Sequence, residues 1–260
     1  MRQGLHPGLS LPAKGAGGAP LVLLHGFLGT PDAWQAVLAA LPQHGPVWCP
    51  WLPGHGPAPA APGDWATAVQ ALAAALPVGA VLAGYSMGAR LALGAALEPG
   101  TRLHGTLLIG GHVGLATAAE RAERAAQDAT RASALRSQPL ARFVDAWEAQ
   151  PLFATQRNLP EATQARQREA RLVHDAQALA WSFDVAGLAQ MPDLRAAVAA
   201  AQQRLHWLTG ALDTRFTALA ASLVHPPWVT HRVVAGAGHN LLLEAPADVA
   251  ASLAACREKA

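Results

Sequence analysis

Residues 84–88 of this chain read GYSMG, directly after the apolar run 81–83 (VLA) and directly before the helix-like run 89–93 (ARLAL). A serine between glycines at this spacing, placed between a strand and a helix, is typical of a nucleophile elbow. The serine occupies a strained turn, the glycines leave room for the tight backbone, and the hydroxyl projects above the sheet. The motif therefore predicts an α/β fold in which Ser86 carries the chemistry.

Short apolar runs predict six strands, and each of the first four is followed by a loop or a helix-like segment. The runs are continuously apolar rather than alternating, which indicates that helices cover both faces of a mostly parallel sheet. The predicted strands are residues 20–24, 46–49, 80–83, 106–109, 205–208 and 229–234.

Between residues 112 and 190 strand-like runs are absent, and Ala-, Gln- and Arg-rich helical stretches replace them. We interpret this block as a helical cap inserted into an α/β core made of residues 1–111 and 191–260. The block holds nine arginines and nine acidic residues, so its net charge is near zero. Most of these charges are expected on solvated helix faces.

Composition narrows the classes of function. Hydrophobic residues make up 52% and charged residues 14% of the chain, which excludes a disordered protein. The net charge of +2, without a dense basic run, gives no reason to expect nucleic-acid or membrane-surface binding. The apolar run 21–24 is too short to span a bilayer. We therefore expect small-molecule chemistry in the cytoplasm, while the oligomeric state stays open.

A serine hydroxyl becomes reactive only when a histidine takes its proton, and that histidine needs a carboxylate partner. His239 lies in the loop 236–240 (GAGHN), which follows the last predicted strand. Asp213 follows the preceding strand in the segment 208–213 (LTGALD). The chain order Ser, Asp, His suits a hydrolase-type triad, so Ser86, Asp213 and His239 are the predicted catalytic residues.

An oxyanion hole needs two backbone N–H donors. One belongs to the residue after the serine, Met87, and the other to the loop after an early strand, where residues 25–27 (HGF) place Phe27. We expect structural roles for His25 and for His55 of the segment 52–56 (LPGHG). No clustered His, Cys or acidic ligand set is evident, so neither a metal nor an organic cofactor is expected.

These segments together resemble the α/β-hydrolase superfamily, and the resemblance spans almost the whole chain. It implies an α/β-hydrolase fold, a mostly parallel sheet flanked by helices with an inserted helical cap. The superfamily includes esterases, peptidases, C–C hydrolases and lyases, so the fold alone does not name the reaction.

Further segments resemble the MenH family, the 2-succinyl-6-hydroxy-2,4-cyclohexadiene-1-carboxylate synthases of menaquinone biosynthesis. They are residues 84–90 (GYSMGAR), the cap stretches 120–124 and 147–153, Arg171, and residues 190–194 (QMPDL), 209–216 and 236–240. The resemblance implies elimination of pyruvate from a substrate with three carboxylates, without an acyl-enzyme. The substrate-binding residues that it implies are Tyr85, Arg90, Arg124, Trp147 and Arg171.

Guanidinium groups suit such a substrate, because burying several carboxylates is costly without charged, bidentate partners. Two alternatives remain at this point. A serine hydrolase of carboxylic esters or C–C bonds would use the same triad, and an apolar tunnel would favour it over convergent arginines. A non-enzymatic binding module on a hydrolase scaffold would require the three triad residues to lie out of hydrogen-bond reach.

Overall fold

The computed structural model describes residues 6–15, 18–223 and 226–257, and within them the strands form one seven-stranded sheet. Its strand order is β1-β3-β2-β4-β5-β6-β7, and every neighbouring pair is parallel except β1 with β3. The predicted fold class is confirmed. The strands are β1 (His6–Leu11), β2 (Leu21–Leu24), β3 (Val47–Trp51), β4 (Ala80–Tyr85), β5 (Leu103–Ile109), β6 (Leu205–Gly210) and β7 (Val229–Val234).

Strand β1 was not among the six predicted strands. Its sequence, HPGLSL, contains Pro7 and Gly8, and both residue types are depleted in strands. The strand lies at the edge of the sheet, where a proline is tolerated. A side chain on Gly8 would meet the carbonyl oxygen of Cys49 at 2.0 Å, so the close approach of β1 to β3 requires a glycine there. The pairing register also shifts between His6 and Leu9.

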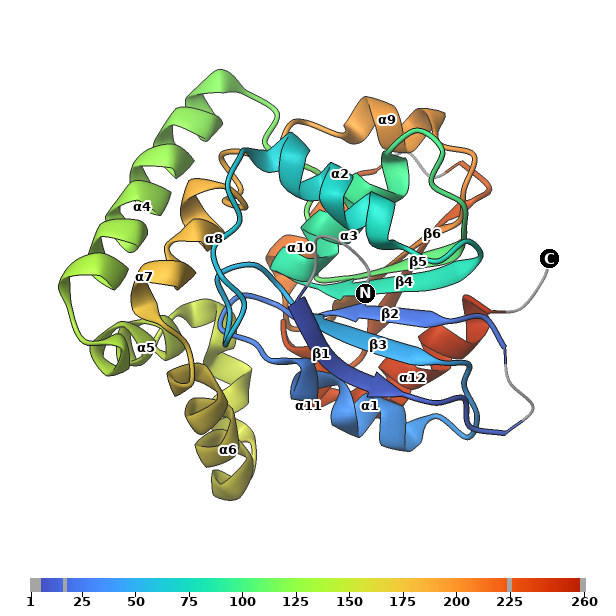
Figure 1. Cartoon of the computed structure of the whole chain (residues 1–260), viewed down its shortest axis with the longest axis horizontal. Helices are drawn as coiled ribbons and strands as arrows, with labels where there is room; N and C mark the ends of the chain where they lie inside the picture. Colours follow the sequence, from blue (N-terminus) through green and yellow to red (C-terminus); the bar gives the residue numbers. More distant parts are fainter. Residues whose placement is uncertain (1–5, 16–17, 224–225, 258–260) are drawn as a thin grey trace.

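Helices cover both faces of the sheet, as Figure 1 shows. On β4, Leu82 points into the core beneath α2 and α3, while Val81 and Ala83 point into the opposite core beneath α1 and α12. This alternation explains why the strand is apolar throughout. The helices that flank the sheet are η1 (Pro31–Trp34), α1 (Gln35–Ala40), α2 (Trp65–Ala75), α3 (Met87–Leu97), α10 (Thr214–Ala221), α11 (Leu241–Glu244) and α12 (Pro246–Ala255).

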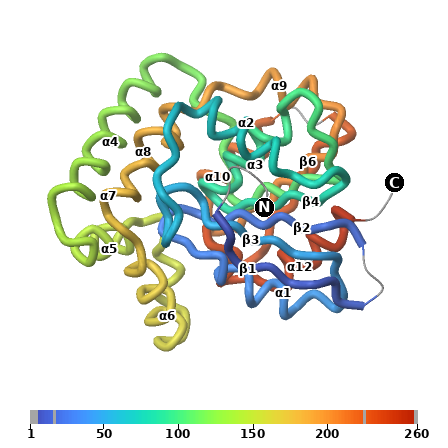
Figure 2. The backbone as a smooth tube through the Cα atoms, viewed as in Figure 1, coloured from blue at the N-terminus to red at the C-terminus, as the bar shows by residue number. Residues whose placement is uncertain are grey.

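The segment between β5 and β6 is helical, and most of it lies to one side of the sheet (Figures 1 and 2). It begins with α4, which Thr117 and Glu120 start with a reciprocal capping box. A small apolar core of its own includes Phe143 and Phe183, and Leu28 of the sheet domain packs into it. The elements are α4 (Ala118–Ser137), α5 (Leu140–Glu148), η2 (Pro151–Asn158), α6 (Glu161–Leu172), α7 (Ala176–Leu179), α8 (Trp181–Asp184) and α9 (Arg195–Ala200).

None of the helices in the described part of the chain combines the length and the apolar character needed to cross a membrane.

Candidate active site

Ser86 occupies the turn between β4 and α3 with φ at 53°, a left-handed conformation that is strained for a serine. The flanking glycines make this turn possible. A side chain on Gly84 would meet the carbonyl oxygen of Gly88 at 2.3 Å, and one on Gly88 would meet the carbonyl oxygen of His25 at 2.4 Å. The Ser86 N–H donates to the carbonyl of Ile109 at 2.8 Å, which ties the turn to β5.

The structure brings the three predicted triad residues into hydrogen-bond contact. The Nδ1 of His239 lies 2.7 Å from Oδ2 of Asp213, and its Nε2 lies 3.1 Å from Oγ of Ser86. Because a carboxylate only accepts, Nδ1 carries the proton and Nε2 is free to accept the hydroxyl proton of Ser86. His239 is 1% exposed and Asp213 is 6% exposed, so water competes little for these bonds. Asp213 also caps α10 by accepting the N–H of Phe216 at 3.3 Å.

Glu244 is a residue that sequence reasoning missed. Its carboxylate accepts the N–H of Gly238 at 2.6 Å and the N–H of Asn240 at 3.2 Å, the two amides on either side of His239. The loop that carries the histidine is therefore anchored from the end of α11. A single acid at the end of a short helix is too common a pattern to have been singled out from the sequence.

The two predicted oxyanion donors lie at places where a backbone N–H lacks a regular partner. Met87 is the first residue of α3, so its N–H has no acceptor within the helix. Phe27 lies in the loop after β2, beside Leu28, whose φ is 57°. Among the hydrogen bonds of the described residues, neither N–H donates to a protein acceptor.

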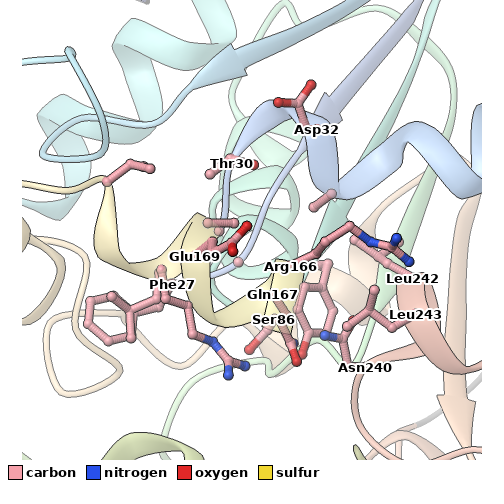
Figure 3. A pocket seen from close by; sticks show the side chains of 18 of the residues that line it. Phe27, Thr30, Asp32, Ser86, Arg166, Gln167, Glu169, Asn240, Leu242 and Leu243 are labelled. Carbon is pink, nitrogen blue, oxygen red and sulfur yellow. The ribbon is translucent and has the colours of Figure 1, made fainter. Parts of the chain in front are cut away.

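A cavity of about 1300 Å³ opens above Ser86, between the sheet domain and α6. Figure 3 shows Phe27, Ser86 and Asn240 of the sheet domain near Arg166 and Gln167 of α6. Small-molecule sites usually measure about 300–1000 Å³, so this cavity is large. Of the residues predicted for the site, the cavity is lined by Phe27, Tyr85, Ser86, Trp147 and Arg171.

Aromatic rings form much of the wall near His239. Trp147 packs against Phe27 with ring centroids 4.7 Å apart. Phe153 lies 6.2 Å and Tyr85 lies 5.4 Å from the imidazole of His239. Burial raises the pKa of Tyr85, so its hydroxyl stays a neutral donor at any working pH.

Arg171 is the predicted arginine that reaches this cavity. Its side chain is 9% exposed, and its Nη1 donates to Glu148 Oε1 at 2.6 Å. The guanidinium also lies 5.8 Å from the centre of the Phe153 ring. Glu148 is shared, because Arg168 donates to its other oxygen at 3.1 Å. Arg168 also pairs with Asp145 at 2.6 Å, so the two guanidinium groups are balanced by two carboxylates, and Arg171 is the member of this cluster of charges that lines the cavity.

Arg90 and Arg124 are not among the residues that line this cavity, so of the three predicted arginines Arg171 is the one that reaches it. Arg124 donates through Nε to Asp128 at 2.7 Å, four residues further along α4. Arg90 donates through Nη1 to the carbonyl of Ala186 at 2.6 Å. Burial, reinforced by the charge of Arg124, lowers the pKa of Arg90 to about 9. Asp128 binds Arg131 as well, at 3.2 Å, so the cluster of Arg90, Arg124, Arg131 and Asp128 has more positive than negative groups.

Three histidines pack together beneath the loop that carries Phe27. The rings of His25 and His55 are 4.9 Å apart, and those of His55 and His174 are 5.3 Å apart. Burial lowers the pKa of His25 to about 3 and that of His174 to about 4, so both are neutral near pH 7. His25 accepts the N–H of Leu52 at 3.2 Å, which joins two loops at the cavity floor.

Comparisons with known proteins place the chain among enzymes of related sequence. A model of the alpha/beta hydrolase family matches residues 21–252. The protein named 2-succinyl-6-hydroxy-2,4-cyclohexadiene-1-carboxylate synthase from Enterobacter sp. (strain 638) is 38% identical over 243 residues, covering 90% of each chain. The protein of the same name from Escherichia fergusonii is 37% identical to this chain over 240 residues, covering 90% of this chain and 92% of that protein.

Solved structures with a similar fold include a MenH and an esterase. The structure of MenH from S. aureus superposes with a TM-score of 0.88 at 25% identity, covering 95% of this chain and 96% of that one. A thermophilic esterase from Thermogutta terrifontis superposes with a TM-score of 0.75 at 24% identity, covering 96% and 93%. The second likeness concerns the fold alone.

Proposed function

We propose that Ser86, His239 and Asp213 carry the lyase reaction of this chain. The chain belongs to the alpha/beta hydrolase family and, within it, to the family of 2-succinyl-6-hydroxy-2,4-cyclohexadiene-1-carboxylate synthases. The resemblance to the MenH family is confirmed by relatives that match along 90% of the chain. The chain is accordingly a lyase of menaquinone biosynthesis on an α/β-hydrolase fold.

The proposed reaction starts from 2-succinyl-5-enolpyruvyl-6-hydroxy-3-cyclohexene-1-carboxylate. The C2–H bond and the C5–O bond break, and the 3-ene becomes a 2,4-diene. The enolpyruvyl group leaves as the enolate of pyruvate and gains a proton. No water is consumed and no acyl-enzyme is needed, so the large cavity has to position one substrate rather than two.

The hydrogen-bonded chain from Ser86 through His239 to Asp213 carries the proposal. As Ser86 Oγ takes the C2 proton, its own proton passes to His239 Nε2, 3.1 Å away. The buried carboxylate of Asp213, 2.7 Å from Nδ1, stabilises the imidazolium that forms. His239 then returns a proton to the departing enolate.

Negative charge develops on the succinyl carbonyl oxygen while the C2 proton leaves. The N–H groups of Phe27 and Met87, free of protein acceptors among the described residues, are the donors that we assign to this oxygen. Preorganised donors in a site that excludes water stabilise such a charge without reorganisation.

The carboxylates of the substrate are matched by positive charge from two sides. Arg171 lies in the cavity wall, and we propose that it binds one carboxylate of the substrate. We propose that Tyr85 and Trp147, which also line the cavity, pack against the cyclohexene ring of the substrate. Arg90 lies one helical turn after Ser86 on α3, with Arg124 close to it. We propose that this pair stabilises the bound anion through its field, since charges act strongly across a dry protein wall.

Hydrolysis of esters is a second candidate activity of the same triad, because the aromatic wall and the cavity of about 1300 Å³ would also accept an apolar acyl chain. A non-enzymatic binding module is not supported, since its premise was that Ser86, His239 and Asp213 lie out of hydrogen-bond reach.

The test supplies the enolpyruvyl substrate and follows pyruvate and the diene together, in wild type and in Ser86→Ala. Equal amounts of both products from wild type, with loss of activity in the variant, support the proposal. Hydrolysis of neutral esters by wild type without pyruvate release would replace it with the hydrolase.

A further inference from the structure

A second, smaller cavity of about 210 Å³ lies outside the site described above. It is bordered by the loop after β5, by the start of α4 and by the start of α10. Phe216 forms one wall, and the ring of Phe216 also contacts the imidazole of His239, with centroids 4.6 Å apart. The cavity is lined by His112, Leu115, Ala116, Glu120, Arg195, Arg215, Phe216 and Leu219.

His112 presents an unused donor to this cavity. The residue is 7% exposed, and its Nδ1 accepts the N–H of Gly114 at 3.0 Å. Because Nδ1 is an acceptor, the neutral ring carries its proton on Nε2. None of the hydrogen bonds of the described residues uses that N–H, and the nitrogen is not among the fully buried polar atoms without a partner, so it is open to the cavity. A ligand in the cavity can therefore accept a hydrogen bond from it in place of water.

Cationic groups surround the same imidazole. Burial lowers the pKa of His112 to about 3, and the charges of Arg90, Arg215, Arg195 and Arg124 add to the effect, so the ring is neutral near pH 7. Arg215 is exposed and makes no hydrogen bond or ion pair in the described part of the chain. An acceptor with negative charge would therefore be favoured over water.

Two other polar side chains of the cavity, Glu120 and Arg195, have protein partners. Glu120 accepts the N–H of Thr117 at 2.9 Å and the hydroxyl of Thr117 at 3.0 Å. Arg195 donates to Asp193 at 2.8 Å and to the carbonyl of Gly114 at 3.3 Å. His112 Nε2–H and the guanidinium of Arg215 make no hydrogen bond to the described residues, whereas Arg195 is tied to its protein partners through Nη1. The N-termini of α4 and α10 add their positive dipole ends to the same place.

We propose that this cavity binds a small organic carboxylate, held by His112 Nε2–H and Arg215. Apolar side chains of Leu115, Phe216 and Leu219 line the rest of the space, which suits a short carbon skeleton better than an inorganic oxyanion. Pyruvate, the product of the proposed reaction, belongs to this class of ligand and is the probe of choice. The choice of pyruvate as the probe rests on the proposed function, whereas the binding site itself is inferred from the residues of the cavity alone.

The experiment titrates the full-length protein, with ¹⁵N-labelled histidine, with pyruvate and with the neutral pyruvamide. The imidazole resonances of His112 report on the small cavity, and calorimetry gives the dissociation constant. Arg215→Gln is the main variant, because an exposed side chain can be replaced without disturbing the core. Arg142→Gln, at an exposed position on α5, is the matched control, and Arg171→Gln reports on the large cavity.

We expect pyruvate to bind with saturation, to shift the His112 signals and to bind about tenfold more weakly to Arg215→Gln, as the loss of one charged hydrogen bond predicts. Arg142→Gln and Arg171→Gln should leave those shifts unchanged, and pyruvamide should not compete. Absence of saturable shifts at His112, or their loss in Arg171→Gln alone, would overturn the proposal. Pyruvate release by wild type, measured separately, shows whether the proposed lyase reaction itself holds.

Discussion

Replacing Arg171 with methionine removes a charge from the cavity wall while keeping an apolar stem against Phe153. The guanidinium lies 5.8 Å from that ring, and methionine packs well beside aromatic rings. Glu148 keeps its contact with Arg168 at 3.1 Å, and its side chain is 29% exposed, so the variant leaves no isolated buried carboxylate. We therefore expect only a small change in the free energy of unfolding.

The expected effect on catalysis follows from the loss of one charged hydrogen bond to a substrate carboxylate. Such bonds contribute about 1.5–3 kcal/mol, which corresponds to a fall of roughly 10- to 150-fold in kcat/KM. The assay measures kcat/KM for pyruvate release from the enolpyruvyl substrate and, in parallel, for hydrolysis of a small neutral ester. The first should fall by this factor, and the second should change little.

Arg168→Met is the matched control. Arg168 binds the same Glu148 but is 37% exposed, and it is not among the residues that line the cavity. Its loss should leave both reactions near wild-type rates. Equal losses on both substrates in Arg171→Met, or an equal effect of Arg168→Met, would refute the assignment of Arg171 to a substrate carboxylate.

The remaining predictions concern the triad, its support and the buried histidines. Asp213→Asn should lower kcat by about 10⁴-fold, because an amide favours the wrong tautomer of His239, and thermal unfolding should show an intact fold; an active variant would contradict the role of Asp213. Glu244→Gln should lower kcat with little change in KM and shift the pH profile, because the glutamine side chain can accept a hydrogen bond through only one of its two terminal atoms. Glu244→Asp, which keeps the carboxylate, should restore part of the rate. Equal changes in kcat and KM would indicate a merely structural role. His25 and His174 have folded pKa values of about 3 and 4, below the ordinary 6.5, so the unfolded chain binds more protons and stability is lost as the pH falls from about 6.5. Urea unfolding should show a loss of about 1.4 kcal/mol per pH unit for each of the two, and equal unfolding free energies at pH 7 and 5 would contradict their neutrality.

Strong local signals made the central part of the fold predictable. The continuous apolar run of β4 and the glycines of residues 84–88 predicted a buried strand, a strained turn and a helix, and the structure has all three. Asp213 and His239 could be selected because parallel strands end at one edge of a sheet, so loops after β6 and β7 meet near Ser86. Strand β1 was missed because Pro7 and Gly8 oppose strand propensity, and its edge position tolerates both.

Side-chain partners in the helical segment were not predictable in the same way. Sequence spacing places Arg124 four residues before Asp128, and this pair could have been anticipated as a helix ion pair. Whether Arg171 or Arg124 reaches the cavity depends on how α4 and α6 pack in the fold. No short sequence motif predicts that packing. Glu244 acts on backbone amides, and such contacts leave no signature in residue type or spacing.

Single-turnover pyruvate release from substrate deuterated at C2, compared with unlabelled substrate, tests most directly whether the reaction proceeds by removal of the C2 proton rather than by acylation of Ser86. The proposed mechanism predicts slower release from the deuterated substrate, with the mass of the intact protein unchanged during turnover. Equal rates together with a mass increase located at Ser86 would show a covalent acyl-enzyme and contradict the mechanism.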